Sequence, residues 1–225
     1  MVHKQRKQGR PKAGTEPLTR ERILETALKL VDEWGVDQLT MRRLAAMLKV
    51  DPMAIYHHLP GKQAVLGGLV EMVFSEFKVP MQQDAPWQER VRAFTQSYRD
   101  LTRTHANLVL YLVTDAQAAV NAALPVNEIL FRALAAASLS PQTILHAANL
   151  IIDYLNGYAL AETSGQLEQS NARQEMLNAL AKHPPEAFPV MRMVFNSLAA
   201  DETQDGGKIE LEIILAGIEA LTRQS

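Results

Sequence analysis

The apolar residues of this chain recur at helical spacing from residue 19 almost to the C-terminus, and this constrains its fold more than any other feature. Thr19 is a good N-cap, and Ile23, Ala27, Leu30 and Trp34 then follow at intervals of three or four residues. No stretch long enough to form a strand alternates apolar and polar residues. The sequence therefore predicts an all-α fold.

Prolines and glycines divide this pattern into separate helices, because neither residue continues a helix readily. Residues 1–17 contain glycine and proline but almost nothing apolar, and are predicted to be a disordered basic arm. The expected helices cover residues 19–34, 41–49, 52–59, 62–79, 87–105, 107–121, 125–138, 141–163, 172–182, 186–199 and 208–223.

Charge is distributed unevenly along the chain. Residues 1–62 hold 12 Lys and Arg against 7 Asp and Glu, while the remainder holds 11 against 18. The first 14 residues carry five basic side chains and no acidic one. A basic N-terminal segment followed by an acidic remainder favours a polyanionic partner for the N-terminal segment alone. A solubilising tail would have the same composition.

The sequence gives no sign of a membrane or secretory protein. No segment approaches the roughly 20 uninterrupted apolar residues that span a bilayer. The basic N-terminus has no apolar region behind it, as a secretory signal would. The chain has no cysteine, which is compatible with a reducing compartment. We expect a cytoplasmic protein without a membrane partner.

The stretch DPMAIYHHLPGK, residues 51–62, predicts a short helix with an exposed polar face. Asp51 is a good N-cap, and Pro52 suits the first helical position. Two short helices joined by a tight turn and preceded by a third form a helix-turn-helix DNA reader, whose second short helix enters the major groove. Ile55 and Leu59 would point inward. The outward residues would be Pro52, Met53, Tyr56 and His57.

Other kinds of site find less support. His57 and His58 are poor candidates for a shared metal, because adjacent helical residues point about 100° apart and no HExxH motif is present. Residues 206–208, GGK, lack the upstream glycine and strand of a phosphate loop. No Ser-His-Asp set can be inferred from spacing. We expect no catalytic site, no metal and no cofactor.

Residues 18–66, LTRERILETALKLVDEWGVDQLTMRRLAAMLKVDPMAIYHHLPGKQAVL, resemble the DNA-binding domain of the TetR family of transcriptional regulators. The residues that fit the family pattern are Thr40, Val50, Tyr56, His57, His58, Leu59 and Lys62. The resemblance implies a helix-turn-helix domain over residues 18–63 and contacts to double-stranded operator DNA from Thr40, Arg42, Arg43, Pro52, Met53, Ala54, Tyr56, His57, His58 and Lys62. Lys49 departs from the pattern, because the family usually has glycine there. Pro52 departs too, since the family often has a hydrogen-bonding side chain at that position.

Residues 105–113, 140–163 and 206–223 resemble the larger regulatory domain of the tetracycline-repressor branch. This implies a C-terminal regulatory and dimerisation domain over residues 64–225, connected through helix 62–79. The implied homodimer contacts are Ile151, Leu155, Leu211, Ile214, Leu215, Ile218 and Leu221. The implied cavity for an unidentified small-molecule effector draws on Phe94, Tyr98, His105, Tyr111, Phe131, His146, Asn149, Asp153 and Tyr154. The apolar stripe of the last helix would equally suit a monomer core, although a helix-turn-helix reader favours the dimer.

The sequence thus predicts a repressor that binds a palindromic operator as a homodimer and is released by a small molecule. The alternatives are an enzyme or ligand-storage protein with a vestigial helix-turn-helix, and a structural nucleoid-type DNA binder.

Two adjacent glycines, Gly67 and Gly68, lie inside helix 62–79. They indicate either close packing of another helix or a flexible joint between the helix-turn-helix domain and the C-terminal domain.

Overall fold

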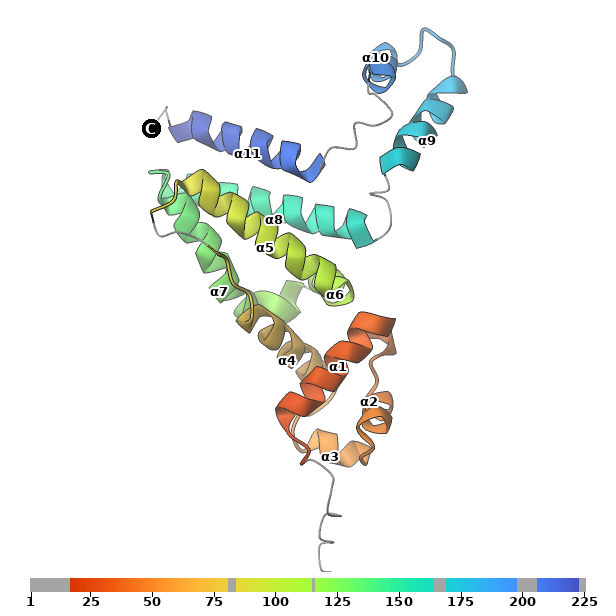
Figure 1. Ribbon diagram of the computed structural model, residues 1–225, viewed down its shortest axis with the longest axis vertical. Helices are drawn as coiled ribbons and strands as arrows, with labels where there is room; N and C mark the ends of the chain where they lie inside the picture. The colour runs from red at the N-terminus through yellow and green to blue at the C-terminus, as the bar shows by residue number, and fades with distance from the viewer. Residues whose placement is uncertain (1–16, 81–83, 115, 164–168, 198–205, 223–225) are drawn as a thin grey trace, which may run out of the picture.

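The computed structural model describes residues 17–80, 84–114, 116–163, 169–197 and 206–222. Within these ranges the chain forms α-helices and one 3-10 turn, η1 (Val36–Gln38), with no strand, so the all-α prediction is confirmed. The helices are α1 (Arg20–Trp34), α2 (Met41–Leu48), α3 (Pro52–Tyr56), α4 (Lys62–Ser75), α5 (Trp87–Thr104), α6 (Ala106–Thr114), α7 (Ala116–Ala135), α8 (Pro141–Thr163), α9 (Gln169–Ala181), α10 (Pro189–Ser197) and α11 (Gly206–Thr222) (Figure 1).

The turn between α2 and α3 explains why glycine would suit position 49. Lys49 lies in the left-handed region, at φ 56° and ψ 43°. The next amide, of Val50, donates to the carbonyl of Ala45 at 3.0 Å and closes the end of α2. An L-residue in this conformation costs about 1–2 kcal/mol because its Cβ approaches the following carbonyl oxygen. The tight turn is therefore kept at the expense of local strain.

Helix α3 is shorter than predicted. It ends at Tyr56 rather than Leu59, and His57 begins a turn. The amide of Leu59 still donates to the carbonyl of Ile55 at 2.9 Å, and Leu59 is buried. The chain then bends at Gly61, whose φ of 114° is accessible to glycine and strained for other residues. The inward-pointing residues keep their place although the last turn is not α-helical.

Helix α4 connects the three N-terminal helices to the body and ends at Ser75, before the predicted residue 79. A Cβ added at Gly68 would lie 2.7 Å from Cδ2 of Leu24 on α1, so close packing accounts for this glycine. A Cβ added at Gly67 would meet nothing within 4 Å. Farther along α4, Glu71 pairs with Arg20 of α1 at 2.9 Å. The two adjacent glycines therefore have different surroundings.

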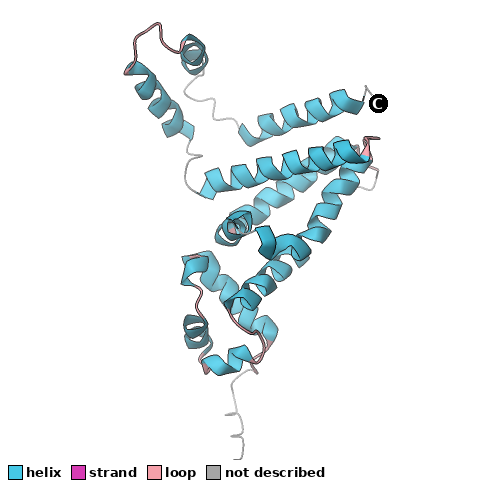
Figure 2. Ribbon diagram, turned by 180° about the vertical axis from the view of Figure 1, so that it is seen from behind, coloured by secondary structure: helices cyan, strands magenta, loops and turns pink. Residues whose placement is uncertain are grey.

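The body consists of α5 to α8, with α11 alongside α8 (Figure 1). Helices α9 and α10 pack on each other and stand away from the body (Figure 2). The predicted break at Pro125 is wrong, because this proline lies inside α7. One continuous apolar core runs from α1 through α4, α5, α7 and α8 to α11. No helix of the described ranges is long and apolar enough to cross a membrane.

Candidate nucleic-acid interface and ligand cavities

Helix α3 presents an exposed face above a buried one. Ile55 is fully buried, whereas Met53 and Tyr56 are 62% and 43% exposed. The side chain of Asp51 accepts a hydrogen bond from the amide of Met53 at 2.8 Å, which fixes the start of the helix. His57 and its neighbour His58 are exposed. The predicted outward residues therefore form one surface, with Pro52 and Ala54 partly exposed at its edge.

Helix α2 carries two arginines in different surroundings. Arg42 is exposed. The Arg43 guanidinium lies 4.4 Å from the centre of the Trp34 ring and donates to Oε1 of Gln38 at 2.9 Å. Its backbone amide donates to the hydroxyl of Thr40, the N-cap, at 3.1 Å. In this structure Arg43 braces α2 against the end of α1, and its predicted contact with DNA would compete with that role.

Lys62, like Arg43, is bonded within the protein. Its ammonium group donates to the carbonyl of Val36 at 2.8 Å and is partly buried. This bond ties the first residue of α4 to η1. Sequence reasoning assigned Lys62 to operator DNA and missed this bond, since no local pattern links positions 26 residues apart.

Of the nine residues predicted to line an effector cavity, two belong to a buried ring cluster. Phe94 contacts Phe77 edge-on, with ring centroids 5.6 Å apart, and stacks on Tyr98 at 6.3 Å. The Tyr98 hydroxyl donates to Oδ1 of Asn156 at 2.8 Å. Burial disfavours the phenolate and raises the pKa of Tyr98 to about 12.

Two further candidates link the body to the N-terminal helices. His105 lies 3.0 Å from the carboxylate of Asp32 at the end of α1. The hydroxyl of Tyr111 donates to Oε1 of Gln63 on α4 at 3.3 Å. Both contacts connect the reader to the body, so the polar groups of these side chains already have protein partners.

The remaining candidates do not converge on one cavity. His146, Asn149 and Asp153 are exposed on the outer face of α8. Phe131 packs against the apolar core, and the Tyr154 hydroxyl donates to the carbonyl of Gly207. The structure therefore does not bring the nine predicted residues together.

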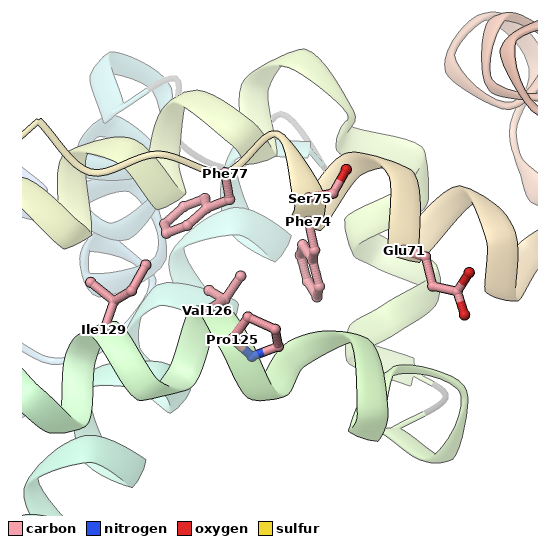
Figure 3. A pocket seen from close by; sticks show the side chains of 7 residues that line it. All are labelled: Glu71, Phe74, Ser75, Phe77, Pro125, Val126 and Ile129. Atoms are coloured by element: carbon pink, nitrogen blue, oxygen red, sulfur yellow. The ribbon is translucent and has the colours of Figure 1, made fainter. Parts of the chain in front are cut away.

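A cavity of about 360 Å³ lies between the end of α4 and the middle of α7 (Figure 3). Phe74 and Phe77 face Pro125 and Val126 across it, as Figure 3 shows. Its other lining residues are Glu71, Ser75 and Ile129. None of the nine predicted residues lines it, because no local pattern links the proline inside α7 to the end of α4. His105 lines a second cavity, between the end of α4, the segment that follows it and the second half of α5.

No metal site emerges within the described ranges, where no three or more His, Cys, Asp or Glu side chains lie close enough to hold an ion.

Comparison with known proteins identifies the family. Residues 23–69 match the model for bacterial regulatory proteins of the tetR family. Residues 79–222 match the model for the tetracyclin repressor-like C-terminal domain, which covers more than half of the chain. The chain belongs to the TetR family.

Individual TetR relatives align over most of the chain. A curated HTH-type transcriptional regulator of Saccharopolyspora erythraea is 29% identical over 194 residues, covering 86% of this chain and 79% of that protein. The crystal structure of apo ActR from Streptomyces coelicolor is 26% identical, covers 93% of this chain and 98% of its own, and has a TM-score of 0.77. A structure of ActR in complex with actinorhodin is 26% identical, covers 91% and 98%, and has a TM-score of 0.72. The chain is thus a DNA-binding transcriptional regulator with the two-part organisation of TetR proteins.

The residues predicted to form the dimer face of this TetR protein differ in their burial within the protomer. Most of the predicted residues are buried within the protomer, namely Ile151, Leu155, Leu211, Leu215 and Ile218. Ile214 is partly buried, and Leu221 is exposed. A side chain already buried in one protomer has little surface left to bury against another. The apolar residues that are exposed on these two helices include Leu145 and Leu150 on α8 and Ile209 and Ile213 on α11.

Proposed function

We propose that this TetR regulator is a repressor that binds a palindromic operator as a homodimer and releases it when a small molecule binds the body. The observation that carries the proposal is the exposed face of α3, where Met53, Tyr56 and His57 stand above the buried Ile55. Base edges are read from the major groove by such a face on a rigidly held helix.

The exposed apolar stripe on α11, together with the exposed Leu145 and Leu150 on α8, supports a homodimer. On α11, Ile209, Ile213, Ala216 and Ala220 are exposed at helical spacing on the side opposite the buried stripe. One helix-turn-helix module contacts too few base pairs to be selective, so a second copy is needed. A symmetric pair of α8 and α11 faces would bury these apolar side chains and place two recognition helices on one duplex.

The cavity between α4 and α7 is the proposed effector site. Its phenylalanines and proline suit an apolar or aromatic molecule. ActR, whose fold this chain shares, has been crystallised with actinorhodin. The cavity also reaches Glu71, whose carboxylate pairs with Arg20 of α1. A ligand that displaced Glu71 or the end of α4 would therefore act on the helices that read DNA.

Selection of bound sequences from random DNA, followed by footprinting of the selected sites, tests the operator proposal. We expect protection of a two-fold palindrome with half-sites about one helical turn, or a multiple of it, apart (~34 Å). Removal of residues 1–14 should weaken binding mainly at low salt, since five cations near the duplex act through counterion release. Asymmetric footprints would count against the proposed mode.

The dimer is tested independently by sedimentation. Ile213→Lys, at a residue 67% exposed on α11, should shift the protein toward the monomer. Leu124→Lys is the matched control, because Leu124 is 59% exposed on α7 and lies outside the proposed face. If both variants sediment like the unsubstituted protein, the α8 and α11 faces do not form the dimer.

A further inference from the structure

A third cavity, of about 390 Å³, lies between α5 and the first turns of α11. Arg92, Thr95 and Arg99 line it from α5, and Gly207, Lys208 and Glu212 line it from α11. Its volume lies within the range of about 300–1,000 Å³ found for small-molecule sites. It shares no lining residue with the cavity between α4 and α7.

Thr95 is the first sign that this cavity has an occupant. The side chain is 3% exposed, and its hydroxyl is buried with no hydrogen-bond partner among the described residues. Other helical threonines donate to a carbonyl of the preceding turn: Thr26 to Arg22 at 2.8 Å, and Thr102 to Arg99 at 2.8 Å. Buried hydroxyls are normally satisfied in this way, so an unsatisfied one that lines a cavity points to a ligand atom.

The charge around Thr95 is positive. Arg99 is only 5% exposed, donates to the Tyr158 hydroxyl at 2.7 Å and stacks over that ring at 4.3 Å, which fixes its guanidinium beside the cavity. Lys208 adds a second cation. Glu212 is the one carboxylate among the described lining residues, and both its oxygens already accept from Arg92 at 2.6 Å.

The start of α11 adds backbone donors. This helix begins at Gly206, and the first amides of any helix lack intrahelical acceptors and carry partial positive charge. The backbone at Gly207 lies so close to the body that an added Cβ would be 2.6 Å from the ring of Tyr158. The same ring carries Arg99, so the helix start and the guanidinium are held together by one side chain.

We propose that the cavity between α5 and α11 binds the oxyanion group of a small molecule, with the Thr95 hydroxyl donating to it and with Arg99, Lys208 and the start of α11 supplying positive charge. Both a carboxylate of an organic acid and inorganic phosphate have this chemistry. The site does not depend on the proposed repressor function, since binding can be measured without DNA.

The test is calorimetric titration of the full chain with benzoate, inorganic phosphate and benzamide at constant ionic strength. Benzamide matches benzoate in shape but lacks the charge. We expect at least one anion to bind and benzamide not to bind. Thr95→Val should lower the affinity for the anion about 10- to 100-fold, the loss expected when a hydrogen bond to a charged group is removed. Thr102→Val is the matched control, because Thr102 is 4% exposed on the same helix and its hydroxyl is already satisfied.

Two further results bear on the proposal. Without ligand, Thr95→Val should raise Tm because it removes an unsatisfied buried hydroxyl, whereas Thr102→Val should lower it. Lys208→Gln, at an exposed position, should lower the affinity for the anion without disturbing the fold. Binding of benzoate alone would identify an organic acid, and binding of phosphate alone the free ion. Equal binding of benzamide, unchanged affinity in Thr95→Val, or no binding of either anion would overturn the proposal.

Discussion

Gly67→Ala should raise the stability of this protein. Gly67 lies in the interior of α4, where alanine is favoured over glycine by about 0.8–1.0 kcal/mol. An added Cβ would meet nothing within 4 Å, so no steric cost reduces that gain. For a protein of this size a gain of 1 kcal/mol raises Tm by about 2–4 °C.

Gly68→Ala is the matched control, because it changes the same chemistry one residue along the same helix. Its Cβ would lie 2.7 Å from a methyl group of Leu24, and overpacking of this kind costs about 1–3 kcal/mol. We expect Tm to fall or stay level in this variant, and the double alanine variant to show no net gain. The assay is differential scanning calorimetry of the three variants. A fall in Tm for Gly67→Ala, or an equal rise for both single variants, would refute the reasoning.

Three other predictions concern the turn, the ring cluster and the DNA-reading face. Lys49→Gly should stabilise the protein by up to about 1 kcal/mol in chemical denaturation, because glycine accepts the left-handed conformation, whereas Lys49→Ala should not. Burial raises the pKa of Tyr98 to about 12, so the neutral Tyr98 side chain stabilises the fold fully below pH 10, and this stabilisation is lost as pH rises toward 12. Tyr98→Phe removes the ionisable hydroxyl and should therefore flatten the alkaline decline in Tm. In DNA-binding assays, Lys62→Ala should weaken binding to all DNA sequences alike and reduce the slope of log affinity against log salt concentration by about 1. Tyr56→Ala should instead cost ~1–3 kcal/mol of binding free energy and relax the sequence preference at particular base pairs.

The helical architecture and the recognition helix could be predicted because they depend on local signals. Caps such as Thr40 and Asp51, and the spacing of Ile55 and Leu59, act within a few residues of one another. Pro125 shows the limit of such signals, because tertiary packing holds a proline inside α7 despite the hydrogen bond it removes.

The proposed dimer face and the cavities depend on which side of a helix meets which neighbour. Helix α11 carries two apolar stripes, one containing Leu211 and Leu215 and the other Ile209 and Ile213. Periodicity gives the spacing of each stripe but does not say which one packs within the protomer. The cavity residues come from α4 and α7, far apart in the sequence, so only the fold brings them together.

The contacts of α4 make it a lever rather than a hinge. Lys62 is bonded to η1, Gly68 packs against Leu24, and Glu71 pairs with Arg20, so the contacts on both sides of Gly67 hold α4 to the DNA-reading helices. A 14-residue helix is about 21 Å long, so a shift of about 1 Å at its far end tilts the reader by about 3°. A stiff lever of this length neither absorbs nor greatly magnifies motion. The proposed effector at the end of α4 would therefore have to move this helix by a distance comparable to the displacement required of the recognition helix.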